Sequence, residues 1–174
     1  KHEKLQRVTY YAGLSLARKI GMITYRSPLE FNERFGRDVK DPREHFLQGL
    51  YEVQSYLDHQ GKKFVARFDP NTYLYFSRAM DLFDIEVGHD SLAAAFRDCS
   101  TRVLLLSIDS DFLVPPAHMR ELYEALTEAG LEVELQLMES RYGHDAFLLP
   151  IPRYLDIFHA YMDGVAARSF GDKS

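Results

Sequence analysis

Residues 102–139 read RVLLLSIDSDFLVPPAHMRELYEALTEAGLEVELQLME, and this segment indicates the class of fold. Residues 102–109 form a short apolar run, which is typical of a strand buried on both faces of a parallel sheet. Residues 117–130 place apolar side chains at helical spacing and end at Gly130, and residues 131–139 alternate as a strand does. A strand, a helix and a second strand in this order predict a β-α-β unit of an α/β fold.

An acidic residue follows the first predicted strand, and a histidine follows the second. Asp111 lies just past the first strand and His144 a few residues past the second, so one β-α-β step separates them. Functional residues collect beyond the carboxyl ends of parallel strands. An acid and then a histidine at successive strand ends is the downstream half of a Ser-Asp-His triad of the α/β-hydrolase type, in which the carboxylate orients the histidine that deprotonates the serine.

Other interpretations of these two residues stay open. An aspartate after a strand is often a turn or helix-cap residue, and Asp109 competes with Asp111 for any role. A histidine in a loop is often structural or solvated, although Gly143 lets this loop bend. If Asp111 and His144 form a pair, we expect a carboxylate oxygen and an imidazole nitrogen within about 3.2 Å of each other. We expect Asp109 to point elsewhere.

The serine that such a triad requires is not evident in the sequence. Residues 13–17, GLSLA, come close to the Gly-x-Ser-x-Gly nucleophile elbow, with Ser15 at the centre. Bulky leucines flank this serine, whereas the strained elbow needs small residues. The segment also continues at helical spacing, with apolar positions at Leu16, Ile20 and Ile23. We therefore predict that Ser15 lies in a helix and is not a nucleophile.

The rest of the chain is predicted to be mostly helical. In the first part, Asp41 can cap a helix that has Pro42 at its first position and ends at Gly61. Residues 71–85 are a second helical candidate, although their aromatic content leaves a short strand possible. Residues 151–166 place apolar side chains at helical spacing and close the chain with a helix.

Composition indicates the class of protein. The 174 residues are 46% hydrophobic, which is enough for one sizeable core, and the formal net charge of −5 argues against a nucleic-acid partner or an anionic membrane surface. The single cysteine, Cys99, cannot form an internal disulfide, and no apolar run approaches the length of a membrane span. A reducing, cytoplasmic location is therefore expected, with no nucleic acid and no membrane as partner.

Five segments, taken in order, resemble the homoserine O-acetyltransferases, which are α/β-hydrolase-fold acyltransferases of methionine biosynthesis. The segments are GLSLARKIGMITYRS (13–27), FNERFGR (31–37), VQSYLDHQGKKFVARFDPNTYLYFSRAMDLFD (53–84), SDFLVPP (110–116) and YGHDAFLL (142–149). The likeness runs over nearly all of residues 10–163. Related enzymes that acylate serine, or that use succinyl-CoA, look similar over the same segments.

The resemblance implies a fold and a reaction. Residues 1–85 would be a helical lid inserted before the last strands, and residues 86–174 the C-terminal part of the α/β-hydrolase core. The N-terminal half, with the nucleophilic serine and the oxyanion hole, would be absent. The reaction implied is ping-pong transfer of an acetyl group from acetyl-CoA to the hydroxyl of L-homoserine, with Asp111 as the triad acid and His144 as the base. Acetyl-CoA would be a co-substrate, and neither a metal nor a permanently bound cofactor is expected.

The resemblance also implies residues that bind the substrate and partners that complete the enzyme. Arg18 would hold the carboxylate of homoserine, Tyr25 would line its pocket, and Asp145 would pair with its ammonium group. The alternatives are a solvated charge for Arg18 and ordinary packing for Tyr25. The expected protein partners are the missing N-terminal half and a second copy, which would form a homodimer through the lid helices. Two rival functions stay open, an esterase of the same fold and a non-catalytic interaction module.

Overall fold

The computed structural model describes the backbone of residues 2–40 and 51–170, and the side chains of residues 10–40 and 51–168. Within it the chain divides into two compact units, residues 1–87 and residues 88–174.

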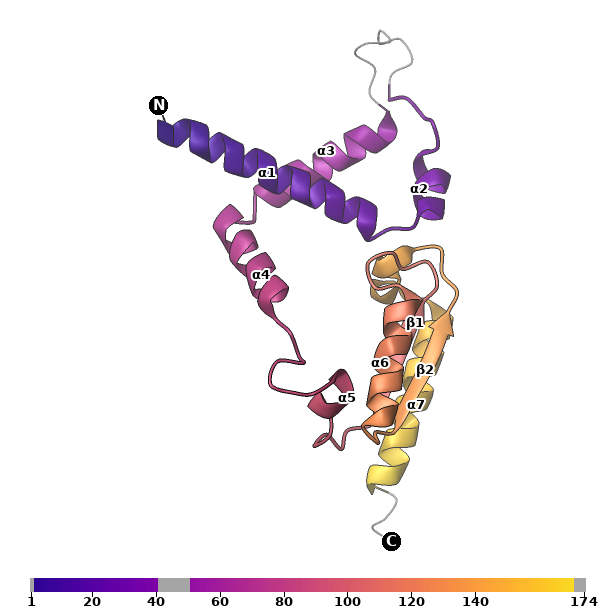
Figure 1. Ribbon diagram of the computed structural model, residues 1–174. Helices are drawn as coiled ribbons and strands as arrows, with labels where there is room; N and C mark the ends of the chain where they lie inside the picture. Colours follow the sequence, from indigo (N-terminus) through magenta and orange to yellow (C-terminus); the bar gives the residue numbers. More distant parts are fainter. Residues whose placement is uncertain (1, 41–50, 171–174) are drawn as a thin grey trace. The chain divides into compact units, whose positions relative to one another are not determined.

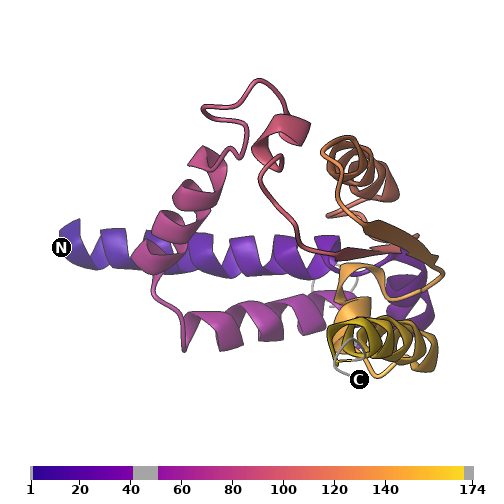
Figure 2. The same ribbon diagram turned by 90° about the horizontal axis from the view of Figure 1, so that it is seen from below.

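The regular elements described in the first unit are helices (Figure 1). They are α1 (His2–Thr24), α2 (Pro28–Phe35), α3 (Glu52–Val65) and α4 (Pro70–Leu82). Helix α3 packs along α1, while α4 contacts α1 and α2 contacts α3 (Figure 2). The side chains buried in this unit include Leu14, Met22, Phe35 and Phe64. Burial of these apolar side chains is the main force that holds short helices together, because helices of this length are marginal alone.

Two helix starts in this unit are fixed by side-chain caps. The hydroxyl of Ser27 accepts a hydrogen bond from the Glu30 amide at 3.1 Å, and a carboxylate oxygen of Asp69 accepts one from the Thr72 amide at 2.9 Å. In both helices a proline follows the cap, where its missing N–H costs nothing. The helix predicted for residues 71–85 is confirmed as α4 as far as residue 82, and Phe83 beyond it is extended.

Gly61 does not end a helix, so the prediction that it does is wrong. The predicted start of that helix, at Asp41 and Pro42, lies outside the described residues, but α3 continues through Gly61 to Val65. A Cβ atom at Gly61 would lie 2.3 Å from the Ser15 hydroxyl oxygen and 3.1 Å from the Ser15 carbonyl oxygen. The glycine therefore allows α3 to approach α1 closely, and this contact overrides its weak helix propensity.

We expect Gly61→Ala to destabilise the protein even though alanine is the better helix former. The added methyl group must displace Ser15 or separate the two helices, which costs about 1–3 kcal/mol for overpacking. Thermal unfolding monitored by circular dichroism measures the change. Gly13→Ala is the matched control, because nothing lies within 4 Å of a Cβ at that position of α1 and the change should be stabilising. A stabilised Gly61→Ala variant would contradict the close contact.

Ser15 lies inside α1, as predicted, and the residues before it are helical and not a strand. A serine in mid-helix cannot form the strand-turn-helix elbow of a hydrolase nucleophile. The apolar positions that predicted this helix are largely exposed, however: Leu16 is 57% and Ile20 is 53% exposed, whereas Leu14 is 4% exposed. The periodicity predicts the helix correctly but not the face that packs on α3.

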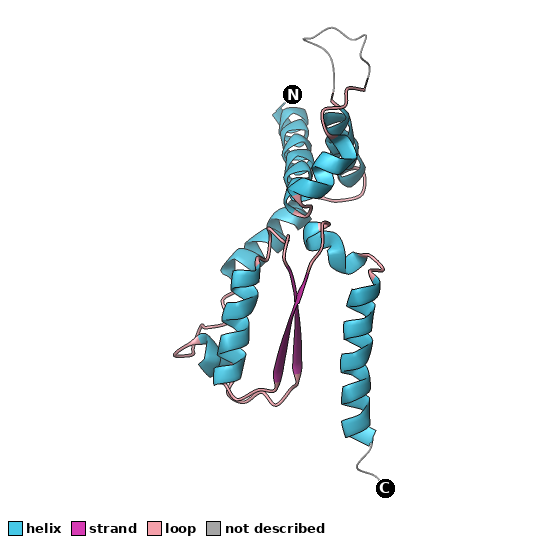
Figure 3. Cartoon of the chain, turned by 90° about the vertical axis from the view of Figure 1, so that its right-hand side faces the viewer, coloured by secondary structure: helices cyan, strands magenta, loops and turns pink. Residues whose placement is uncertain are grey.

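The second unit contains the predicted β-α-β arrangement. Strands β1 (Val103–Ile108) and β2 (Val133–Met138) pair in parallel, in register from Val103 with Val133 to Ile108 with Met138. Helix α6 (Pro116–Glu128) connects them and packs on one face of the sheet. The other elements are α5 (Leu92–Ala95), the 3-10 helix η1 (Gly143–Leu148) and α7 (Pro152–Phe170). Figure 3 shows α6 and α7 on opposite sides of the two strands.

Candidate active site

Asp111 follows β1 in a tight turn that fixes its carboxylate. One carboxylate oxygen accepts hydrogen bonds from the Leu113 amide at 2.8 Å and the Val114 amide at 2.9 Å. The residue is 8% exposed. The turn therefore holds one oxygen as an acceptor of two amide hydrogen bonds and leaves the other to face the cavity.

His144 lies against that second oxygen. Its Nδ1 is 2.9 Å from Oδ2 of Asp111, so the predicted contact of less than about 3.2 Å is confirmed. Gly143 has a φ of 67°, a left-handed conformation that favours glycine, and it begins the 3-10 helix η1 that carries the histidine. The Phe147 ring packs edge-on to the imidazole at 5.5 Å between centroids. Since Nδ1 is held by a carboxylate, Nε2 is the nitrogen that can exchange a proton with a substrate.

Asp109 and Ser110 bind the loop that carries His144. A carboxylate oxygen of Asp109 accepts a hydrogen bond from the Ser140 amide at 2.8 Å, so this acid points away from His144 as predicted. The Ser110 hydroxyl donates to the Ser140 carbonyl and accepts from the Gly143 amide, the latter at 3.1 Å. The loop after β1 therefore positions both Asp111 and the backbone of the loop from Ser140 to His144, which we call the histidine loop.

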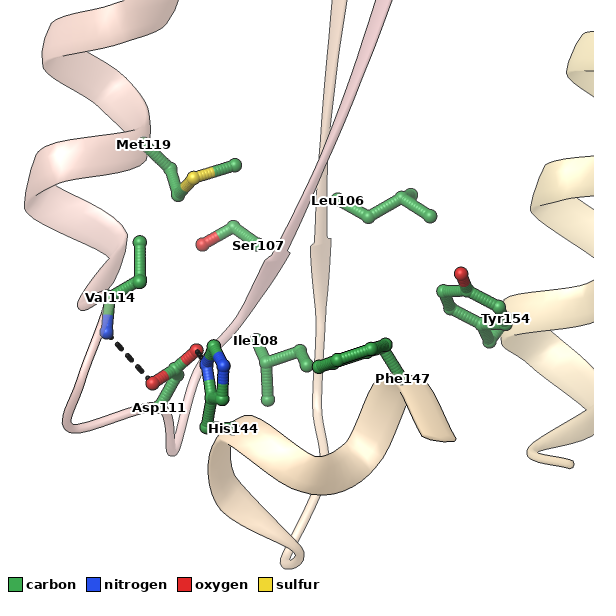
Figure 4. A pocket seen from close by; sticks show the side chains of 9 residues that line it. All are labelled: Leu106, Ser107, Ile108, Asp111, Val114, Met119, His144, Phe147 and Tyr154. Carbon is green, nitrogen blue, oxygen red and sulfur yellow. Dashed lines mark hydrogen bonds and ion pairs between the residues drawn. The ribbon is translucent and has the colours of Figure 1, made fainter. Parts of the chain in front are cut away.

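A cavity of about 280 Å³ lies beside the pair (Figure 4). Ser107, Val114 and Met119 lie on the α6 side of β1, and Leu106, Phe147 and Tyr154 lie on its other side. Asp111 and His144 are at the carboxyl end of the strand. The walls are mostly apolar, which strengthens electrostatic contacts inside the cavity once water is excluded.

Arg18 and Tyr25 belong to the first unit, where they line one cavity of about 400 Å³. Arg18 is in α1, and its guanidinium carbon lies 5.3 Å from the centre of the Phe64 ring. Tyr25 follows the last turn of α1, and its amide donates to the Gly21 carbonyl at 2.9 Å. Both predicted substrate residues therefore face the same cavity, but the structure does not place them relative to Asp111 and His144.

Arg18 differs from the lysine beside it. Lys19 pairs with Asp58 of α3, and this hydrogen bond lowers the pKa of the Asp58 carboxyl. Among the residues that the structure describes, no carboxylate lies within ion-pair distance of Arg18. The cation–π contact with Phe64 thus orients a guanidinium whose hydrogen-bond donors remain for a ligand.

Asp145 follows His144 in η1 and is partly exposed. Its role toward an ammonium group stays a prediction. Within residues 2–40 and 51–170 no group of three or more His, Cys, Asp or Glu side chains could hold a metal ion. No helix in the same ranges is long and apolar enough to cross a membrane.

Sequence reasoning missed three residues that shape this site. Ser110 and Ser140 connect the two loops, and Ser107 is a buried serine in an otherwise apolar strand. Only Ser107 could have been noticed in the sequence, because a serine inside an apolar strand places a hydroxyl group in the core, where it needs a hydrogen-bond partner. Serines in polar loops carry no comparable pattern.

Comparison with known proteins identifies the relatives of this chain. No family model matches the sequence. The homoserine O-acetyltransferase of Moorella thermoacetica is 42% identical over 151 residues, which cover 86% of this chain and 40% of that protein. The homoserine O-succinyltransferase of Halorhodospira halophila is 48% identical over 158 residues, covering 88% of this chain and 41% of that protein. This chain is homologous to the homoserine O-acyltransferases.

The solved structures agree with the homology to the acyltransferases. The crystal structure of homoserine O-acetyltransferase from Staphylococcus aureus is similar with a TM-score of 0.64 and 29% identity, over 87% of this chain and 41% of that one. The fold is therefore part of an α/β-hydrolase fold, as predicted. The chain spans about two fifths of the length of the curated acyltransferases that it matches.

Proposed function

We propose that this chain supplies the acid, the base and the helical lid of a homoserine O-acetyltransferase whose nucleophilic serine lies outside these 174 residues. The observation that carries the proposal is the 2.9 Å contact between His144 Nδ1 and Asp111 Oδ2, in a chain homologous to enzymes of that name. The proposal places residues 1–85 in the lid and residues 86–174 in the catalytic core.

The pair would act on protons in both halves of a ping-pong cycle. In the first half, Nε2 of His144 takes the proton of the serine as its oxygen attacks the thioester carbonyl of acetyl-CoA, and the proton then goes to the departing thiolate. In the second half, Nε2 takes the proton of the homoserine hydroxyl as that oxygen attacks the acyl-enzyme, and returns it to the serine. Asp111 stays ionised throughout and stabilises the imidazolium.

The cavity of the first unit supports a site for the zwitterionic acceptor. Arg18 offers a planar two-pronged donor for the carboxylate of homoserine, and Tyr25 lines the same cavity. Asp145 would take the ammonium group. In the assembled enzyme we propose a homodimer through the lid helices, in the cytoplasm, with a place in methionine biosynthesis.

We expect Arg18→Lys to raise the KM for homoserine about tenfold or more, with little change in the KM for acetyl-CoA. Lysine keeps the charge but loses one of two parallel hydrogen bonds to the carboxylate. Steady-state kinetics of the complete enzyme measure both constants. The matched control is Lys19→Arg, which keeps the charge beside Arg18 and the pairing with Asp58. An unchanged KM for homoserine in Arg18→Lys would remove Arg18 from the site.

Enzyme assays can determine which acyl donor and which acceptor the proposed enzyme uses. Relatives at 42% and 48% identity carry the names O-acetyltransferase and O-succinyltransferase, so acetyl-CoA and succinyl-CoA should be compared as donors, and homoserine and serine as acceptors. An esterase would release the acyl group to water at the same rate with and without homoserine. A non-catalytic module would form no product with any donor even when a nucleophile-bearing part is present.

The deciding experiment compares this chain alone with the chain plus the nucleophile-bearing part of a homologous acyltransferase. We expect no acetyl adduct by mass spectrometry when the chain alone is mixed with acetyl-CoA, because Ser15 is held in α1. Acyl transfer should appear only when both parts are present. Ser15→Ala is the control. An adduct on the wild-type chain that disappears in Ser15→Ala would overturn the assignment of the nucleophile.

A further inference from the structure

The side chain of Ser110 bonds to both ends of the turn that leads into His144. Its hydroxyl donates to the Ser140 carbonyl and accepts from the Gly143 amide, the latter at 3.1 Å. A hydroxyl group has only one proton. Because that proton is used on Ser140, a lone pair is left for the Gly143 amide, and the two bonds together fix the orientation of the hydroxyl. One side chain therefore holds two separate backbone groups of the histidine loop.

The Gly143 amide is the backbone group that directs His144. Gly143 is buried, has a φ of 67° and begins the 3-10 helix η1 that carries the histidine. This left-handed conformation favours glycine. A buried amide needs an acceptor, and the Ser110 hydroxyl supplies it. Without that acceptor the turn at Gly143 rearranges to find another, and the imidazole moves with it.

Ser110 is joined by one peptide bond to Asp111, which is the partner of His144. Oδ2 of Asp111 is 2.9 Å from Nδ1 of His144. The Asp111 amide donates to the Ile108 carbonyl at 3.1 Å, so this turn is anchored to the end of β1. The same anchored turn holds the acid through Asp111 and the histidine loop through Ser110. The Ser110 bonds therefore set the position of the acid and the base relative to each other.

We propose that Ser110 is a positioning residue of the acyl transfer, which acts through His144 and touches neither substrate. Its hydroxyl keeps the imidazole at hydrogen-bond distance from Asp111, so that Nε2 meets the reacting hydroxyl groups in the same place in both halves of the cycle. Ser110 is not among the described residues that line the two cavities. It should therefore affect the chemical step and not the binding of substrates. This inference rests on the proposed function.

Steady-state kinetics of the complete enzyme separate these two effects. We expect Ser110→Ala to lower kcat about 10- to 100-fold, because a displacement of the base by about 1 Å costs a factor of that order. The KM values for acetyl-CoA and homoserine should stay within about twofold. A Ser110→Ala enzyme with the wild-type kcat would overturn the proposal, as would one with raised KM values and an unchanged kcat.

Two further variants make the kinetic test specific to the hydroxyl. Ser110→Thr keeps a group that donates and accepts, so its kcat should stay within about threefold of the wild type. Ser100→Ala is the matched control, because Ser100 is an exposed serine of the same unit, and its kcat should not change. An equal loss of kcat in Ser110→Ala and Ser110→Thr would assign the effect to the size of the side chain and reject the role of the hydroxyl.

Nuclear magnetic resonance tests the positioning without an assay of activity. In the enzyme with isotope-labelled histidine, the proton between Nδ1 of His144 and Asp111 gives an N–H signal far downfield of the backbone amides, which is assigned by its absence in His144→Ala. We expect this signal to disappear or move upfield in Ser110→Ala and to persist in Ser110→Thr and Ser100→Ala. An unchanged signal in Ser110→Ala would show that other contacts hold the imidazole.

Melting temperatures show whether each variant is folded. If Ser110→Ala does not fold, Ser110→Cys takes its place, since a thiol is a weaker donor and a weaker acceptor than a hydroxyl. Its kcat and its downfield signal should then be reduced, with unchanged KM values. A folded Ser110→Cys enzyme with the wild-type kcat and signal would contradict the proposal.

The two measurements distinguish this role from the proposed function. A downfield signal that depends on Ser110, in an enzyme that transfers no acyl group to homoserine, would leave the positioning of the pair standing and reject the function. Transfer to homoserine with the same kcat in Ser110→Ala would leave the function standing and reject the positioning.

Discussion

Replacing His144 by alanine is expected to lower kcat/KM of the acyltransferase proposed above by on the order of 10⁵-fold, because the imidazole is the proposed acceptor of the nucleophile's proton. The imidazole is held by Asp111 through Nδ1 at 2.9 Å, so Nε2 is the nitrogen proposed to exchange the proton. The rate of coenzyme A release, measured with and without homoserine, reports both halves of the cycle.

The control for this change is His118→Ala. His118 is an exposed imidazole in α6 of the same unit, so its removal tests for general effects of losing a histidine. We expect its kcat/KM to stay within about twofold of the wild type, as for most exposed positions. A His144→Ala enzyme that keeps more than a tenth of the wild-type rate would show that another residue is the base.

Asp111→Asn should lower kcat about 10⁴-fold although it changes only one atom. The amides of Leu113 and Val114 both donate to one oxygen of Asp111, so the carbonyl oxygen of the new asparagine must occupy that place. Its NH₂ group then faces Nδ1 of His144 and can only donate. The imidazole is forced into the tautomer with its proton on Nε2, which cannot accept another from the nucleophile.

Asp109→Asn is the matched control for this prediction, since it makes the same change in charge two residues away. Its side-chain oxygen can still accept the hydrogen bond from the Ser140 amide, so the histidine loop stays in place. We expect its kcat to fall by less than about tenfold. A lower kcat for Asp109→Asn than for Asp111→Asn would show that Asp109, and not Asp111, is the acid that acts with His144.

The parts of the fold that follow from local patterns are predictable from the sequence. The strands β1 and β2 and the helix between them are marked by an apolar run, a helical stripe and Gly130, which has a φ of 88° just past α6. The pairing of Asp111 with His144 follows in turn, because parallel strands place their carboxyl ends at one edge of the sheet.

Other features depend on contacts between distant segments, and the sequence does not predict them. Gly61 has the sequence signature of a helix end, but its contact with Ser15 of α1 keeps it inside α3. The buried face of α1 is another example: Leu14 packs inside and Leu16 is exposed, although both are leucines at plausible positions. The partner helix, and not the periodicity, decides which side of α1 is covered.

The hydrogen bonds from the loop after β1 to the histidine loop have a thermal consequence. The amides of Ser140 and Gly143 are bound by the side chains of Asp109 and Ser110, so the histidine loop cannot open without losing bonds at the end of β1. The conformational entropy of this loop is therefore lost when residues 88–174 fold, and not when a substrate arrives. On heating, His144 should keep its place until β1 itself melts, and inactivation should coincide with unfolding of that unit instead of preceding it.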